Sequence, residues 1–154
     1  MKLAQALLTR GNLQADVAQL RTRLKKNAQA KEGSAPSENP LSLIEQIQAA
    51  TEELRGLIKR INRTNSVTEL EPGYLISDAL CDREILKIRH MSYNDLAENA
   101  TVTLGGFYRT EALAGMKSAV DVTEVRKEAS AVAAEFRRLD HQIQAKNWQV
   151  DLLE

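Results

Sequence analysis

Residues 122–147 read VTEVRKEASAVAAEFRRLDHQIQAKN, and this segment carries the clearest structural pattern in the chain. Its apolar residues recur at alternating steps of three and four, which is the spacing of one narrow face of an α-helix. They are Val122, Val125, Ala129, Val132, Phe136, Leu139 and Ile143. Asp121 and Glu124 open the segment with the spacing of a capping box, which predicts a helix start. A helix of this extent would be about 39 Å long, so it favours an elongated hairpin or bundle over a compact globule.

The same steps recur in two earlier segments, so three predicted helices share one pattern. The first series is Leu3, Ala6, Arg10, Leu13, Val17, Leu20 and Leu24, in which Arg10 is the only charged member. The second series is Ile44, Ile47, Thr51, Leu54, Ile58, Ile61 and Asn65. Narrow stripes of this kind are typical of helices that pair lengthwise, as in coiled coils.

A fourth helical segment has a different apolar pattern. Its apolar residues cover a broader arc of the helix, which predicts contact with more than one neighbour. They are Leu80, Ile85, Leu86, Ile88, Tyr93 and Leu96. Together the patterns predict helices over about residues 2–28, 41–64, 77–99 and 122–147. A loop over residues 29–40 separates the first two, because KEGSAPSENP contains helix breakers and ends in an Asn39 N-cap followed by Pro40.

Two segments in the middle of the chain favour short β-hairpins. Residues 66–76 place β-branched and aromatic residues on both sides of Glu-Pro-Gly, in which Pro72 and Gly73 suit a tight turn. Residues 101–120 begin TVTLGGFYR, which alternates before Gly105 and Gly106, so a second hairpin is predicted, with a helix as the alternative. The predicted fold is therefore mainly α. It is a single domain over residues 1–154, an elongated antiparallel helical hairpin or bundle with coiled-coil-like seams and one or two short β-hairpins.

Composition gives little support to several classes of function. The 21 Lys and Arg residues balance 21 Asp and Glu residues, so net charge steers the protein to no particular partner. The basic stretch at residues 21–26, RTRLKK, is interpreted as a solvated helix end whose cations suit the helix dipole. The alternative is a patch for nucleic acid or another polyanion, which the pI near 6.8 and the 4% aromatic content disfavour.

The sequence offers few residues for catalysis or metal binding. It has two His and one Cys, which excludes an internal disulfide framework and makes a reducing cytoplasm the default compartment. Cys81 and His90 lie nine positions apart, which places them on opposite faces of one predicted helix, so they cannot pair for nucleophilic catalysis. No metal-binding spacing, cofactor motif or run of apolar residues long enough to span a membrane is present. We therefore expect a protein that is not an enzyme and has no metal, cofactor or membrane segment.

The most unusual local stretch is KRINRTN at residues 59–65. One interpretation is a helix C-terminus whose polar side chains bind the last carbonyl groups. The other is a polar pocket for an anion, formed by Asn62, Arg63 and Asn65 with Tyr108 and Arg109.

Several stretches together resemble a family of small bacterial proteins described as septicolysin-like or uncharacterised. These are MKLAQALLTRGNLQ at the N-terminus, RINRTN, LISDALCDREILKIR, VDVTEVRKEA and LDHQIQAKNW. The resemblance covers nearly the whole chain and implies a small helical protein. The family name implies an oxygen-labile cytolysin, a function that we rank last because the sequence has no long amphipathic β-hairpin of the membrane-inserting type.

Three functions follow from these patterns. The first is a non-enzymatic, cytoplasmic helical protein or scaffold that forms homo-oligomers through its apolar stripes. The second is a module that binds nucleic acid or another polyanion through residues 21–26. The third is a small-ligand protein or enzyme with a pocket at residues 62–65 and 108–109.

Overall fold

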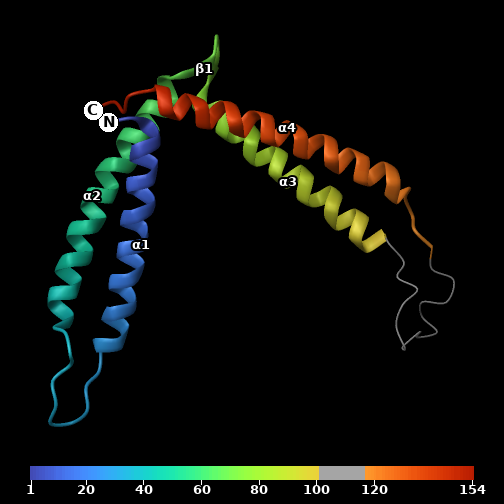
Figure 1. The fold of residues 1–154 in the computed structure, drawn as a ribbon. Helices are drawn as coiled ribbons and strands as arrows, with labels where there is room; N and C mark the ends of the chain where they lie inside the picture. The colour runs from blue at the N-terminus through green and yellow to red at the C-terminus, as the bar shows by residue number, and fades with distance from the viewer. Residues whose placement is uncertain (101–116) are drawn as a thin grey trace. The chain divides into compact units, whose positions relative to one another are not determined.

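The computed structural model of the protein describes residues 1–100 and 117–154. The order of elements is α1 (Leu3–Asn27), α2 (Pro40–Val67), β1 (Glu69–Glu71), β2 (Tyr74–Leu75), α3 (Ile76–Ala100) and α4 (Val122–Gln149) (Figure 1). The predicted fold class is confirmed: the protein is mainly helical, with closely packed helix pairs and a short antiparallel sheet. The second predicted hairpin, over residues 101–120, falls almost wholly outside the described residues.

The chain divides into two compact units. The first contains Met1–Ser77 together with Gln144–Glu154, and the second contains Asp78–Ile143. The first unit therefore holds α1, α2, the β-hairpin and the last turn of α4, whereas most of α3 and α4 forms the second unit.

The predicted apolar stripe of α1 faces inward in the first unit. Leu3 and Ala6 are fully buried, and the other five members of the series are half-buried. Arg10, the charged member, has its Nε atom buried without a hydrogen-bond partner in the part of the chain that the structure describes. The α1 stripe is thus the face that packs against α2, with one polar group inside it.

The stripe predicted for α2 was wrong at two positions. Ile44 is 38% exposed and Thr51 is also exposed, while Leu43, the neighbour of Ile44, is 1% exposed. The buried residues of the helix are Leu43, Leu57, Ile61 and Thr64. The buried face of α2 is therefore rotated about the helix axis by up to one residue position relative to the predicted face. Adjacent apolar residues satisfy either series of steps, so only the position of the neighbouring helix decides between them.

The loop between α1 and α2 is closed by Asn27, which is buried at the end of α1. The Asn27 Oδ1 atom accepts hydrogen bonds from the Ser37 hydroxyl at 2.8 Å and the Glu38 backbone N–H at 3.0 Å. Arg23 forms an ion pair with Glu38. Asn39 then caps α2, because its side chain accepts from the Leu41 N–H at 2.9 Å, as the Asn-Pro pattern predicted.

The predicted hairpin at residues 66–76 is confirmed as β1 and β2. The strands are antiparallel, with Glu69 opposite Leu75 and Glu71 opposite Tyr74. Gly73 has φ +76° in the turn, a conformation that favours glycine. The hairpin leads directly into α3.

The C-terminal segment returns to the start of the chain. Lys2 and Asp151 form an antiparallel β-bridge, and the Leu152 N–H donates to the Met1 carbonyl at 2.8 Å. Lys2 Nζ also lies 3.0 Å from the Asp151 carboxylate. Leu152 is buried, so this segment contributes to the core of the first unit.

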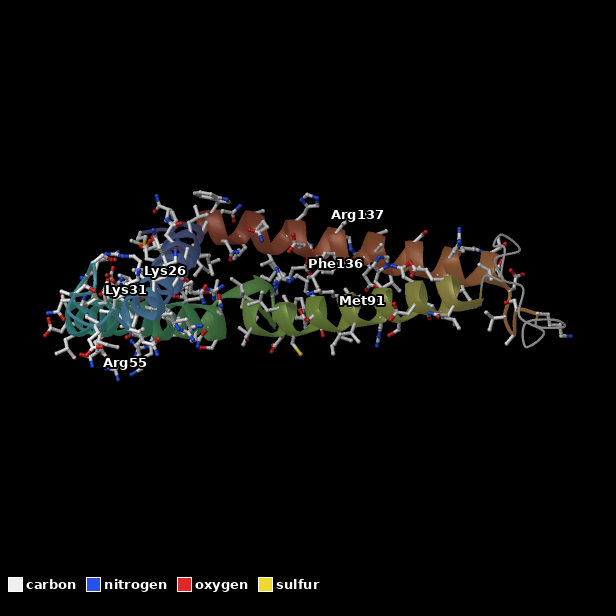
Figure 2. The ribbon with its side chains drawn as sticks, turned by 90° about the horizontal axis from the view of Figure 1, so that it is seen from below. Lys26, Lys31, Arg55, Met91, Phe136 and Arg137 are labelled. Carbon is white, nitrogen blue, oxygen red and sulfur yellow. The ribbon has the colours of Figure 1, made fainter. Side chains whose placement is uncertain are left out.

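In the second unit, α3 and α4 lie side by side and antiparallel (Figure 2). The stripe predicted for α4 faces α3: Ala129, Leu139 and Ile143 are buried, and the other members are half-buried. Arg83 of α3 forms an ion pair of 2.8 Å with Asp140 of α4. No helix in the described ranges 1–100 and 117–154 is long and apolar enough to cross a membrane.

Candidate functional site

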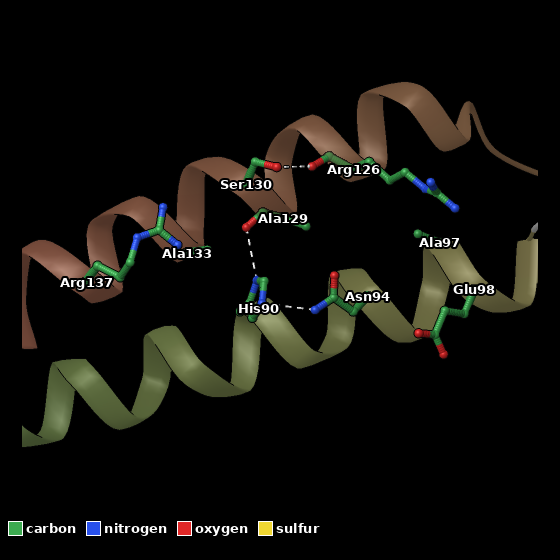
Figure 3. Close-up of a pocket in the computed structure, with 9 residues that line it drawn as sticks. All are labelled: His90, Asn94, Ala97, Glu98, Arg126, Ala129, Ser130, Ala133 and Arg137. Atoms are coloured by element: carbon green, nitrogen blue, oxygen red, sulfur yellow. Dashed lines mark hydrogen bonds between the residues drawn. The ribbon is translucent and has the colours of Figure 1, made fainter.

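A groove of about 400 Å³ lies between α3 and α4, within the second unit (Figure 3). Side chains from both helices line it: His90, Asn94, Ala97 and Glu98 of α3, and Arg126, Ala129, Ser130, Ala133 and Arg137 of α4. Four of the nine are Ala or Ser. The groove therefore exists because small residues occupy positions where larger apolar side chains would fill the space between the helices.

His90 is held by hydrogen bonds to both of its ring nitrogens. Its Nδ1 atom lies 3.0 Å from the Ala129 carbonyl oxygen, and its Nε2 atom lies 3.0 Å from the Asn94 side-chain nitrogen. With the amide as donor, Nε2 accepts and Nδ1–H donates to the carbonyl, which corresponds to a neutral imidazole. His90 therefore joins the two helices across the groove.

Two arginines stand along the α4 side of the groove (Figure 3). The guanidinium groups of Arg126 and Arg137 have no ion pair or hydrogen bond within the described part of the chain, whereas Arg23, Arg60 and Arg83 are paired. Arg126 and Arg137 are eleven residues apart, which corresponds to about 16 Å along one face of a helix. The groove therefore offers two positive charges without an ion pair among the described residues, and one carboxylate, that of Glu98, also lines it.

A row of exposed side chains also runs along α3, and it includes none of the residues that line the groove. We call it the α3 outer stripe: Glu84, Ile88, Met91 and Asp95. Ile88 is 52% exposed and Met91 is 54% exposed. Met91 lies about one turn from Asn94 and two turns from Glu98 on the helix, and both of those residues line the groove. Figure 2 shows Met91 on α3 and Arg137 on α4.

Further apolar residues are exposed on α3 next to this stripe. Ile85 and Leu96 are both exposed, while Ala79, Leu86 and Ala97 of the same helix are buried. The helix thus carries apolar residues on more than one side. This agrees with the broad apolar arc in its sequence, which predicted more than one neighbour.

The structure places three of the five predicted pocket residues at the end of α2. Arg63 donates to the backbone carbonyl of Glu154, while Asn62 is exposed and Asn65 is half-buried. Tyr108 and Arg109 lie outside the described residues, so a pocket that brings all five together stays a prediction.

The RINRTN stretch holds the C-terminal segment. Thr64 is fully buried, and its hydroxyl accepts from the Leu153 N–H at 3.0 Å and donates to the Arg60 carbonyl at 2.8 Å. The Arg60 Nε–H donates to the Leu153 carbonyl at 3.1 Å, and its guanidinium lies 2.7 Å from the Glu154 carboxylate. The contacts with Leu153 and Glu154 span about ninety residues of sequence, so local patterns could not reveal them.

The basic stretch at residues 21–26 forms the end of α1. Lys25 and Lys26 lie in its last turn, where cations favour the negative end of the helix dipole. The hydrogen bond from Arg23 holds the pKa of Glu38 below its usual range. Part of the positive charge in this stretch is therefore balanced within the chain.

Other candidates for chemistry are isolated. Cys81 is a free, exposed thiol on α3. Across residues 1–100 and 117–154, no group of three His, Cys, Asp or Glu side chains is placed to hold a metal ion.

Comparison with known proteins decides the family. The sequence pattern of DUF6847, a family of unknown function, matches residues 10–152. The chain belongs to this family. The name describes no activity, so function must be argued from the molecule itself.

A solved structure has the same fold. It is the crystal structure of a functionally unknown conserved protein from Corynebacterium diphtheriae, with 37% sequence identity, a TM-score of 0.89 and coverage of 99% of both chains. No curated protein matches this chain. The resemblance to septicolysin-like proteins was therefore wrong, because the matching family and the similar structure are both of unknown function.

The sequence patterns gave no sign of a groove at Arg126, Ser130, Ala133 and Arg137. Their spacing at steps of four, three and four was visible in the sequence. Its meaning depends on which face of α4 borders α3, and that is a property of the packed helix pair.

Proposed function

We propose that the protein is a non-enzymatic, cytoplasmic scaffold-type protein that self-associates through the α3–α4 unit. The observation that carries this proposal is the exposure of Ile85, Ile88, Met91 and Leu96 along α3. A helix with apolar residues on two sides is stabilised when each side has a neighbour. In the second unit, α4 covers one of those sides.

The amount of apolar surface on α3 fits a reversible interaction. Burying the exposed half of a large apolar side chain contributes about 1 kcal/mol. Four such side chains on each of two copies contribute roughly 8 kcal/mol, which is comparable to the cost of bringing two molecules together. Apolar burial alone therefore roughly offsets that cost, so micromolar association, which needs about 8 kcal/mol of net free energy, requires further contacts between the copies.

Two features of the described residues support a role without catalysis. Both ring nitrogens of His90 already have hydrogen-bond partners, which leaves the ring without a free site for proton transfer. His90 lies on the opposite face of α3 from Cys81, as their nine-residue spacing dictates, so the two cannot pair as base and nucleophile.

Sedimentation equilibrium at roughly 1–100 µM, which covers micromolar dissociation constants, tests the proposal. The wild-type protein should be an oligomer, and the double substitution Ile85→Glu and Ile88→Glu should make it monomeric. Leu8→Glu is the matched control, since Leu8 is also an exposed apolar residue inside a helix but belongs to the first unit. A wild-type protein that stays monomeric at 100 µM would refute the proposal.

A further inference from the structure

We infer that the α3 outer stripe of one copy docks into the α3–α4 groove of a second copy, so that two second units bind each other reciprocally. This inference rests on the proposed self-association and specifies its surface. It is carried by a match between two rows of side chains, one on each helix of the same unit.

The two rows have the same spacing and complementary chemistry. On α3, Glu84, Ile88, Met91 and Asp95 follow one another at steps of four, three and four. On α4, Arg126, Ser130, Ala133 and Arg137 follow the same steps. Each row thus has two central residues between two charges on one face of a helix, and the charges are acidic on α3 and basic on α4.

The central residues are complementary in size. Ile88 and Met91 are large, apolar and more than half exposed. Ser130 and Ala133 are small and line the groove. A volume of about 400 Å³ lies within the range of cavities that bury ligands of moderate size. Two side chains from a neighbouring helix would fill space that is otherwise lined by small residues, as knobs fill holes in helix bundles.

The end charges are available for contacts between copies. In the described part of the chain, Arg126 and Arg137 have no ion pair, and the Asp95 carboxylate has none either. Glu84 has only a loose pair with Lys87, at 3.9 Å on an exposed surface. Exposed ion pairs of this kind contribute little to stability. Little free energy is therefore lost when Glu84 leaves Lys87 and pairs with an arginine of a second copy.

The alignment of α3 with α4 inside one unit determines which charged residues of two copies would lie at the same height along the helix axes. Arg83 lies opposite Asp140 in the antiparallel α3–α4 pair, which places Glu84 level with position 139. A twofold axis along the helices would set α3 of one copy across from α4 of the other, at the same level. Glu84 would then be two residues, or about 3 Å, from the second copy's Arg137 along the axis.

With the same alignment and the same twofold axis, Asp95 would lie about 3 Å along the axis from the second copy's Arg126. Arginine side chains are long enough to cover that difference. Because the symmetry repeats each contact, both grooves would be filled and the assembly would close as a dimer with four charge pairs.

Charge exchange at positions 95 and 126 tests this interface. Asp95→Arg alone and Arg126→Asp alone each place like charges at two contacts of a homodimer, so each dimer should dissociate at least about tenfold more readily, equivalent to about 1.4 kcal/mol. An equimolar mixture of the two variants should form a heterodimer of wild-type affinity. One of its two contacts is then the native pair of Asp95 and Arg126, and the other is the same pair with the two charges exchanged. Sedimentation and native mass spectrometry would measure both effects.

Lys127→Glu is the matched control. It reverses a charge next to Arg126 on α4, but its side chain is 73% exposed and is not among the groove residues. It should leave the dimer unchanged. Circular dichroism of each variant checks that the helices are retained.

The outcomes separate this inference from the proposed function. A wild-type dimer that both single variants weaken, and that the mixture restores, supports the interface. A wild-type oligomer that neither variant weakens, or that the mixture fails to restore, overturns the interface but leaves self-association intact. A monomeric wild-type protein overturns both.

Discussion

Thr64 offers the sharpest test of how the chain holds its C-terminal segment. Its side chain is 0% exposed, and its hydroxyl accepts the Leu153 N–H at 3.0 Å. Thr64→Val keeps the shape of the side chain but removes this acceptor. Thr64→Ser keeps the acceptor and removes one methyl group. The two variants therefore separate the hydrogen bond from the packing.

The two variants are expected to lose free energy of unfolding for different physical reasons. An amide left without its acceptor costs about 1–3 kcal/mol when water cannot replace the partner. Because Leu153 is itself partly exposed, the value for Thr64→Val should fall near 1–1.5 kcal/mol. Loss of one buried methyl in Thr64→Ser costs about 1 kcal/mol. The two variants should thus lose similar global stability, so melting alone would not distinguish them.

Amide hydrogen exchange at Leu153 does distinguish them. In Thr64→Val the Leu153 amide should exchange about tenfold faster relative to the core amides, because it loses its own acceptor. In Thr64→Ser its protection should change only as much as that of its neighbours. Equal Leu153 protection in Thr64→Val and the wild type would refute the assignment of this hydrogen bond as the anchor of the segment.

Two further predictions concern acid stability and the turn. Because the hydrogen bond and charge of Arg23 lower the pKa of Glu38 in the folded state, this pair stabilises the protein above the unfolded carboxyl pKa of about 4.3 and its contribution is lost as pH falls through the lower folded value. Denaturant titrations between pH 7 and pH 3 should therefore show a smaller acid-induced loss of stability in Glu38→Gln than in the wild type, and parallel pH profiles would contradict this. Gly73→Ala should destabilise the protein by about 1–2 kcal/mol, because Gly73 has φ +76° and an added Cβ meets no atom within 4 Å, which leaves backbone strain as the cost. Gly56→Ala is the control, because Gly56 lies inside α2 and also has open space around it. The same substitution there should stabilise the protein by about 0.4–1 kcal/mol. Thermal denaturation measures both variants, and stability changes of equal sign would show that φ does not decide the effect.

The candidate site shows where sequence patterns stop being informative. The unusual composition of RINRTN was evident from the sequence, but the partners of Arg60, Arg63 and Thr64 lie about ninety residues away. No local spacing encodes such a contact. The groove beside α3 is similar, since its lining residues are ordinary alanines and arginines until the two helices are placed together.

The sequence by itself determined the helices, the loop and cap before α2, the hairpin turn and the inward stripes of α1 and α4. In these segments one apolar series, one capping residue or one Pro-Gly pair favours a single local structure, because backbone conformation and helix periodicity act over a few residues. On α2, Leu43 and Ile44 satisfied two series equally well, and only packing against α1 selected Leu43. The return of the C-terminal segment, the groove and the exposed side of α3 were likewise decided by tertiary structure, because contacts between distant residues determine which side chains are buried and which remain free to bind.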